Sequence, residues 1–394
     1  SMPSMPTTLT LTEYEPLRLD AHVLPTAVLE QLWRDYDQHG RQLEVTFPSP
    51  KTDHQWQLTA LGWVGLIPLG RQDVLDIRPK TPLTNLFRLW ETAYGLQDAH
   101  LLDGLVAAAS LHDFYQHLAH TLARRALRRA QQGLYRAYLT ETRPLPAIRG
   151  QITQYPQPPQ VQPTCRYQES TTDLPDNQIV AYTLAHIARS GLCEGMAQTA
   201  VRRAAHVWQS AVTPTPITPA DCVGRPYTRL NQDYAPLHAL CRFFLEHGGP
   251  AYQPGDHAMR PFLINMARLY ERFVAAWLAA HLPSPWRMRA QETIHVGARN
   301  ELQFTLDLVL YAGDGRAHTI LDTKYKTPDA ASTTDVSQVV TYAQAKGCRE
   351  AVLVYPEPLA RPLDLHVGDV HVRSLTFAPE NKAAGGEFLT ALLG

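Results

Sequence analysis

The amino-acid sequence predicts a multi-domain α+β protein with a β-rich N-terminal domain, a helical middle region and a C-terminal α/β domain. At 394 residues the chain is too long for one ordinary hydrophobic core. Hydrophobic residues make up 44% of it and charged residues 19%, which is typical of a folded globular protein. The periodicity of the apolar residues changes twice, and these changes place the domains at 8–95, 96–250 and 255–394.

Short runs rich in β-branched and aromatic residues characterise the first domain. They are QLEVTF, QWQLTALGWVGLIPL and VLDIRPK, and the breaks FPSPKTDH and LGRQD separate them. Because such residues fit a half-buried pleated surface, residues 8–80 are expected to form a small sheet or barrel.

Apolar residues at helical spacing characterise the middle region, which is expected to be mostly α. One long helical segment is expected over 101–139. A helix pair or a single long helix is expected over 174–209, with Asp176 or Asn177 as its N-cap. A further helix is expected over 234–247.

Two proline-rich segments interrupt the helical pattern of the middle region. They span 143–164 and 213–226. Because proline punctuates regular structure, both are expected to be connecting loops.

The C-terminal domain follows the order α-β-β-α-β, with one or two strands at its end. This order within about 130 residues indicates a compact α/β domain. The elements are expected at 264–282, within 302–323, and at 333–347, 350–357 and 365–377.

Charge, cysteine content and hydropathy exclude several classes of protein. The net charge of −1 gives no sign of a polyanion partner, so any nucleic-acid surface must be local. Five widely spaced cysteines without a CxxC pair argue against a disulfide framework and a structural zinc site. With no apolar run near the ~20 residues of a membrane span and no signal peptide, we expect a cytoplasmic, reduced protein without a membrane partner.

An aspartate interrupts the otherwise apolar strand FTLDLVL. A buried, unpaired carboxylate costs roughly several kcal/mol, so Asp307 requires a metal, a partner or solvent. The turn AGDGR predicts a hairpin that brings Asp307 near Asp322. Since residues two apart share a strand face, Asp322 and Lys324 point the same way.

Two carboxylates and one ammonium group at one end of a sheet suit Mg²⁺, with Mn²⁺ as an alternative, because both ions prefer hard oxygen ligands. Such an ion can activate water for attack on a phosphodiester, and a lysine beside it can stabilise charge or orient that water. The pair Asp-x-Lys alone is common at solvated strand ends. Asp307 at the right distance upstream favours the metal site.

The segments LDLVL, ILDTKYK and SQVVTYA together resemble the PD-(D/E)xK nuclease core. More closely, they resemble the C-terminal domain of the McrC family, the nuclease subunit of McrBC-type modification-dependent restriction systems. The resemblance implies that Asp307 and Asp322 bind the metal and that Lys324 is the catalytic lysine. Leu306 departs from the motif, since proline usually stands there.

Four further residues follow from the same resemblance. Glu271 in LYERFV matches the helix that opens the core and completes the metal site. The backbone carbonyl of Thr323 adds a metal ligand in this fold. Gln338 and Tyr342 match a QxxxY helix whose pair supports the site and the DNA.

The resemblance extends over most of the chain. GWVGLIPLGRQDVLDIRPKTPLTNLFRL, IRGQI and YQESTTDLPDNQIV are similar, in the same order, to earlier segments of the family. It implies a magnesium-dependent endonuclease acting on modified or double-stranded DNA together with an AAA+ GTPase subunit of McrB type. Two alternatives stay open: an adaptor that stimulates this GTPase with little nuclease activity of its own, and a stand-alone RecB-like nuclease.

Other charged groups have competing interpretations. Arg78 or Lys80 could touch the GTPase that the family implies, or be ordinary surface charge. His112, His117 and His120 have the spacing of helical metal ligands, but satisfied helix histidines explain them better, since no carboxylate cluster accompanies them.

A basic stripe lies in the first helical segment. It indicates a surface for phosphates or an acidic partner, or equally a solvated helix face. Its members are Arg124, Arg125, Arg128, Arg129 and Arg136. The chain contains neither a P-loop nor a GxSxG nucleophile motif.

Overall fold

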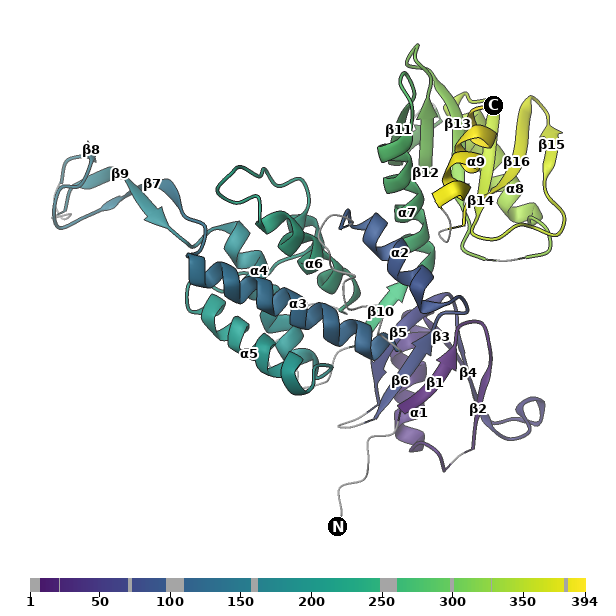
Figure 1. Cartoon of the computed structure of the whole chain (residues 1–394), viewed down its shortest axis with the longest axis horizontal. Helices are drawn as coiled ribbons and strands as arrows, with labels where there is room; N and C mark the ends of the chain where they lie inside the picture. The colour runs from purple at the N-terminus through teal and green to yellow at the C-terminus, as the bar shows by residue number, and fades with distance from the viewer. Residues whose placement is uncertain are drawn as a thin grey trace. The chain divides into compact units, whose positions relative to one another are not determined.

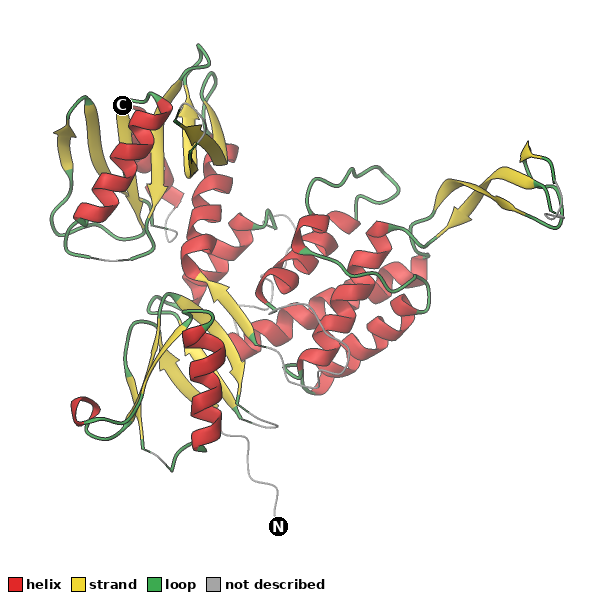
Figure 2. Ribbon diagram, turned by 180° about the vertical axis from the view of Figure 1, so that it is seen from behind, coloured by secondary structure: helices red, strands yellow, loops and turns green. Residues whose placement is uncertain are grey.

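A computed structural model describes residues 8–20, 22–69, 73–96, 110–156, 162–248, 261–297, 301–326, 328–378 and 382–394. The chain forms two compact units, which we describe separately. The inserted unit is His112–Phe262, and the split unit combines Ser1–Leu111 with Leu263–Gly394. Helices alternate with several sheets, which confirms the predicted mixed α and β composition (Figures 1 and 2). The three domain boundaries stay a prediction.

The N-terminal part of the split unit contains two small sheets, in the orders β1-β6-β5-β10 and β2-β4-β3. Their strands are β1 (Thr8–Thr12), β2 (Leu17–Leu19), β3 (Leu43–Thr46), β4 (Trp56–Ala60), β5 (Trp63–Pro68), β6 (Val74–Arg78) and β10 (Phe262–Asn265). Apolar side chains such as Leu43, Leu58 and Ile67 form a common core that excludes water. The sequence did not predict helix α1 (Thr26–Leu32), which buries Leu29 in this core.

A six-stranded sheet in the order β11-β12-β13-β14-β16-β15 forms the C-terminal part of the split unit. β11, β12 and β13 are antiparallel neighbours, whereas β14 is parallel to both β13 and β16. The strands are β11 (Arg287–Val296), β12 (Leu302–Tyr311), β13 (Ala317–Thr323), β14 (Glu350–Tyr355), β15 (Asp364–Val367) and β16 (Val370–Thr376).

Helices accompany this sheet and supply part of the candidate site. They are α7 (Met266–His281), α8 (Thr333–Lys346) and α9 (Lys382–Leu393), and α2 (Leu83–Ala93) packs on α7. α8 packs Val339 and Ala343 against buried residues of the sheet such as Ile320 and Leu353. The predicted order is present, but β11 is an additional strand that the sequence analysis missed.

The inserted unit combines four helices with an arm of three strands, ordered β7-β9-β8 (Figure 1). The helices are α3 (Leu111–Gln132), α4 (Pro175–Ser190), α5 (Gly195–Gln209) and α6 (Tyr234–His247). The strands are β7 (Ala137–Pro144), β8 (Gln151–Gln154) and β9 (Thr164–Thr171). The proline-rich segment 143–164 is therefore not a simple connection, because it contains β8 and the adjoining ends of β7 and β9.

Two predictions for the inserted unit were wrong in detail. The helix expected over 101–139 ends at Gln132, since Gly133 adopts a φ of +97°, and the chain then enters β7. Residues 101–109 lie outside the described residues. The N-cap of α4 is Leu174, because Pro175 begins the helix one residue before Asp176. None of the helices among the described residues combines the length and the hydropathy of a membrane span.

Candidate active site

An antiparallel strand pair carries two aspartates to the C-terminal end of β13. Leu308 pairs with Leu321, so Asp307 and Asp322 are the next residues in register. The Asp307 carboxylate accepts hydrogen bonds from the backbone N–H of Thr323 at 3.1 Å and from its hydroxyl at 3.3 Å. The hairpin predicted from the AGDGR turn is present, and it brings both carboxylates together.

Lys324 follows β13 directly, and oxygen atoms surround its ammonium group. Its Nζ lies 2.7 Å from Oδ2 of Asp322 and 3.6 Å from Oδ1 of Asp335. It also donates a hydrogen bond to Oε1 of Gln338 at 3.2 Å. Burial by itself lowers the pKa of Lys324. The nearby charges of Asp322 and Asp335 have the larger combined effect, so the pKa of Lys324 is raised. The lysine is therefore charged at physiological pH.

Helix α8 extends this hydrogen-bonded chain. Nε2 of Gln338 donates to the Tyr342 hydroxyl at 2.8 Å, which the spacing of one helical turn allows. The Tyr342 ring packs on Phe304 of β12, with ring centroids 5.6 Å apart. The structure thus connects Lys324, Gln338 and Tyr342 in a continuous row.

Glu271 comes from α7 and meets a strained residue of β11. Nε2 of Gln291 donates a hydrogen bond to Oε1 of Glu271. Gln291 has a φ of 52°, in the left-handed region, and the β11–β12 pairing skips it at the position facing Asp307. Backbone strain of this kind costs on the order of 1 kcal/mol and clusters at functional sites.

Of the carboxyl groups of Glu271, Asp307 and Asp322, two have a raised pKa. Burial, followed by the nearby charge of Asp307, raises the pKa of Glu271 to about 7. The same two causes raise the pKa of Asp322 to about 7, although Lys324 acts in the opposite direction. The site therefore holds more negative charge than its lysine neutralises, which is a pattern common at functional sites.

The donor set fits a hard divalent cation in its chemistry. Mg²⁺ and Mn²⁺ prefer carboxylate and carbonyl oxygens, and such oxygens belong to Glu271, Asp307, Asp322 and Thr323. Among the residues that the structure describes, no three His, Cys, Asp or Glu side chains are already grouped to hold a metal ion. One oxygen of each carboxylate faces the amide, hydroxyl or ammonium partner given above.

Sequence analysis missed Gln291, Asp335 and Tyr325. Gln291 lies on the strand that was not predicted. Asp335 is buried in the first turn of α8, where its backbone N–H donates to the Ser332 side chain at 3.1 Å. A serine followed three residues later by an acidic residue is a helix-start signal, which could have drawn attention to Asp335.

Tyr325 connects the site to the N-terminal strands of the split unit. Its hydroxyl donates at 2.9 Å to Glu13, a carboxylate only 1% exposed that also accepts from the Lys80 N–H at 3.0 Å. Burial, followed by the charge of Glu13, raises the pKa of Tyr325, so the hydroxyl stays protonated and donates. Tyr325, the residue after Lys324, is therefore held in position by Glu13, which lies outside the six-stranded sheet.

The three candidate histidines of α3 belong to the inserted unit. His112 contacts the carbonyl of Leu192 at 3.2 Å. Burial, followed by the charges of Arg124 and His117, lowers the pKa of His120. No described metal-holding group includes the three helix histidines.

Two basic candidates near the end of β6 have different surroundings. Arg78 forms an ion pair with Asp76 at 3.0 Å. Lys80 is exposed and contacts Glu13 through its backbone. Whether either residue binds a partner stays a prediction.

Comparison with known proteins relates most of the chain to one family. The family described as McrBC 5-methylcytosine restriction system component matches residues 58–356. A search of curated proteins found no match.

Two solved structures from Thermococcus gammatolerans are similar to the chain. One is a half-complex of McrB AAA+ hexamers with bound McrC, at 18% identity and a TM-score of 0.58, covering 98% of this chain and 99% of that one. The other is an McrBC complex, at 20% identity and a TM-score of 0.46, covering 71% and 89%. At 18% identity the first likeness shows a shared fold. Because the family match spans about three quarters of the sequence, the chain belongs to the family of McrBC 5-methylcytosine restriction system components.

Proposed function

We propose that the chain is the McrC-type subunit of a restriction system and a metal-dependent DNA endonuclease with a PD-(D/E)xK core. The main support for the proposal is that Asp307, Asp322 and Lys324 lie close together at the end of one hairpin. The raised pKa values of Glu271 and Asp322 support it, because a bound cation would neutralise the negative charge that the carboxylates share. McrC is bound to McrB AAA+ hexamers in the similar T. gammatolerans assembly, so we propose a McrB-type GTPase as this chain's partner.

The chemistry follows from the positions of the side chains. Carboxylates of Glu271, Asp307 and Asp322, with the Thr323 carbonyl, would hold Mg²⁺ or Mn²⁺. When bound, the ion polarises the phosphodiester and lowers the pKa of an attacking water.

Lys324 and its neighbours serve the same reaction. The Lys324 ammonium stabilises negative charge that develops on the phosphoryl oxygens or orients the water. Gln338, fixed by Tyr342, holds Lys324 in place from α8. Gln291 and Asp335 hold Glu271 and Lys324 in position in the same way.

Plasmid cleavage with Mg²⁺ tests the proposal, using modified and unmodified DNA, with and without the GTPase subunit and GTP. Asp307→Asn and Lys324→Ala are each expected to lower cleavage at least ~100-fold, because each removes a group that acts on the transition state. Asp314→Asn is the matched control, since Asp314 lies exposed in the turn between β12 and β13.

The outcomes separate the candidate functions. Cleavage that needs the GTPase and is lost in both variants supports the restriction subunit. Cleavage by the chain alone supports a stand-alone nuclease. GTP turnover that rises on adding the chain, without any cleavage, supports an adaptor.

A further inference from the structure

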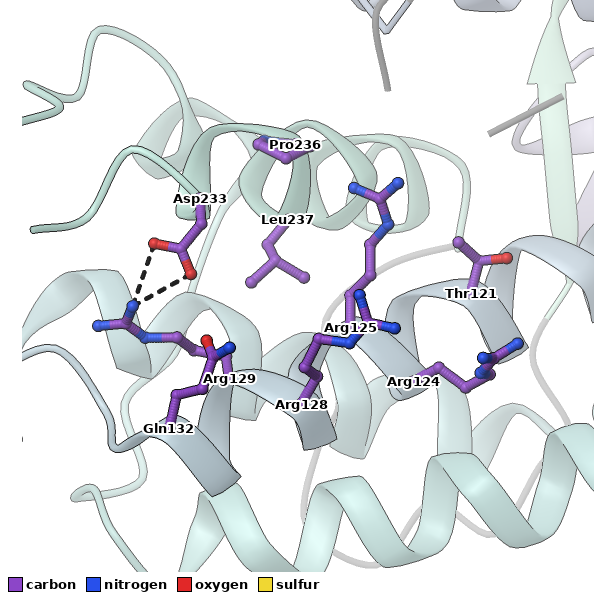
Figure 3. A pocket seen from close by; sticks show the side chains of 9 residues that line it. All are labelled: Thr121, Arg124, Arg125, Arg128, Arg129, Gln132, Asp233, Pro236 and Leu237. Atoms are coloured by element: carbon purple, nitrogen blue, oxygen red, sulfur yellow. Dashed lines mark hydrogen bonds and ion pairs between the residues drawn. The ribbon is translucent and has the colours of Figure 1, made fainter. Parts of the chain in front are cut away.

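A cavity of about 430 Å³ lies between α3 and α6 of the inserted unit, and four of the nine residues that line it are arginines. Four arginines of α3 lie in its wall, together with a carboxylate, Asp233, beside the start of α6, toward which Arg129 points (Figure 3). These arginines are Arg124, Arg125, Arg128 and Arg129, which are four of the five in the basic stripe of the sequence. The fifth, Arg136, instead donates to the Ser170 hydroxyl at 3.2 Å.

The helix repeat explains why the arginines gather. Residues four apart rise by about 6 Å and share one side of a helix. Leu118, Leu122 and Ala126 are fully buried at this spacing and fix one face of α3 in the core. Arg125 and Arg129 repeat at the same spacing beside that face, whereas Arg124 and Arg128 repeat at it on the exposed side of α3. Both pairs contribute to the lining of the cavity.

Arg129 forms an ion pair with Asp233, the carboxylate in the cavity lining. Its Nη1 lies 3.2 Å from both oxygens of Asp233 (Figure 3). Its guanidinium carbon lies over the Tyr234 ring, 5.0 Å from the ring centroid. Arg124 and Arg128 are exposed and form no ion pair with a described residue. Burial, followed by the charge of Arg128, lowers the pKa of Arg125. Arg124 and Arg128 thus carry positive charge that an anion bound in the cavity would neutralise.

The charge distribution along the chain points to the same unit. Residues 112–262 contain 15 arginines, no lysine and 10 acidic residues, a formal balance of +5. Since the whole chain carries −1, the split unit carries −6. A polyanion is therefore attracted to the inserted unit and repelled by the rest of the chain, apart from any bound cation.

We propose that the arginine cavity binds the phosphodiester backbone of DNA. The guanidinium fork matches phosphate oxygens in a bidentate geometry. Thr121 and Gln132 add neutral hydrogen-bond donors of the kind that contact DNA backbones. An acidic protein segment is less favoured, because Pro236 and Leu237 alone give little apolar surface for a buried anchor. The choice of DNA as ligand depends on the proposed function.

Binding of a fluorescein-labelled 20-base-pair duplex to the full chain, measured by anisotropy in EDTA, tests the proposal. The variant Arg124→Glu/Arg128→Glu is compared with Arg202→Glu/Arg203→Glu, an exposed pair on α5 with the same charge change. The cavity variant is expected to bind about 100-fold more weakly at 0.1 M salt, roughly tenfold per phosphate contact, with a salt slope lower by about 2. The α5 variant is expected to lose no more than about threefold.

Several outcomes would overturn the proposal. Equal losses in both variants mean a general charge effect. Unchanged DNA binding with lost binding of the GTPase subunit means an acidic protein surface. Loss of labelled GTP binding while DNA binding is kept means a nucleotide site.

Two further measurements keep these results interpretable. If the glutamate variant does not fold, as judged by thermal unfolding, Arg124→Gln/Arg128→Gln replaces it, with at least tenfold weaker binding expected. Because cleavage cannot occur in EDTA, a failure of the nuclease proposal in the plasmid assay stays distinguishable from a failure here.

Discussion

At the scale of single residues, Glu271 and Asp322 make the metal-free site unfavourable at neutral pH. A carboxyl group whose pKa is higher in the folded than in the unfolded chain contributes stability at low pH. That stability is lost as the pH rises from the unfolded pKa through the folded one. For Glu271 this window runs from 4.5 to about 7.

Neutralising Glu271 should therefore stabilise the metal-free protein at high pH. We expect Glu271→Gln to raise the free energy of unfolding by about 1–2 kcal/mol at pH 8 and to change it little at pH 4.5. The full pKa shift corresponds to about 3 kcal/mol, which we reduce because the side chain keeps contact with water. Urea unfolding in EDTA at both pH values measures this.

The exposed Glu357→Gln is the control for this experiment, and it should show no pH-dependent gain. A gain from Glu271→Gln that is equal at both pH values would mean that charge repulsion is not its cause.

At the scale of elements, β11 combines polar composition with one strained position. Gln291 has a φ of 52°, which disfavours any side chain with a Cβ by about 1 kcal/mol. Gln291→Gly is therefore expected to be more stable than Gln291→Ala by about 1 kcal/mol, although both lose the hydrogen bond to Glu271. Urea unfolding of the two variants measures the difference.

The two variants also separate strain from function. Both are expected to lower cleavage, since neither can hold Glu271 from β11. If Gln291→Gly retained full cleavage, the hydrogen bond to Glu271 would not position the carboxylate.

Strong periodic patterns were sufficient to predict several elements. The β12–β13 hairpin, α8 and β14 have clear apolar periods or turn residues, and the structure contains all three. β11 escaped prediction because Glu292 interrupts the alternation of apolar residues in its sequence, RMRAQETIHV, and no residue of the strand is fully buried. The β7–β9 arm escaped for a related reason, since it is largely exposed and lies among prolines.

Local sequence patterns predicted part of the candidate site. Asp307, Asp322 and Lys324 follow from alternation along two strands joined by a turn. Glu271 was reached only through family resemblance, because nothing local relates α7 to the hairpin. Gln291 meets Glu271 only after β11 pairs with β12, so no local pattern reveals it.

At the scale of the whole molecule, the hydrogen bond between Tyr325 and Glu13 joins the two ends of the split unit. Tyr325→Phe is expected to lower the free energy of unfolding by about 1–3 kcal/mol, because it leaves a buried carboxylate without one of its donors. A double-mutant cycle with Glu13→Gln should give a coupling of about 1–2 kcal/mol. Urea unfolding measures all four proteins.

The exposed Tyr138→Phe is the control and should change stability by less than about 0.5 kcal/mol. Because Tyr325 adjoins Lys324, Tyr325→Phe should also lower kcat for cleavage more than it changes KM. Additive effects of the two substitutions would show that the hydrogen bond does not couple the two ends.

The sheet that contains β5 and β10 has a consequence for synthesis on the ribosome. β5 ends at Pro68 and its neighbour β10 begins at Phe262, so about 190 residues are translated between the two strands. At a translation rate of about 5–20 residues per second, roughly 10–40 s pass between synthesis of β5 and synthesis of β10, so the edge of β5 stays unpaired for that time. During that interval the nascent chain displays an unpaired strand edge, where premature pairing and aggregation begin. The inserted unit, by contrast, is continuous in sequence and can fold as soon as it emerges.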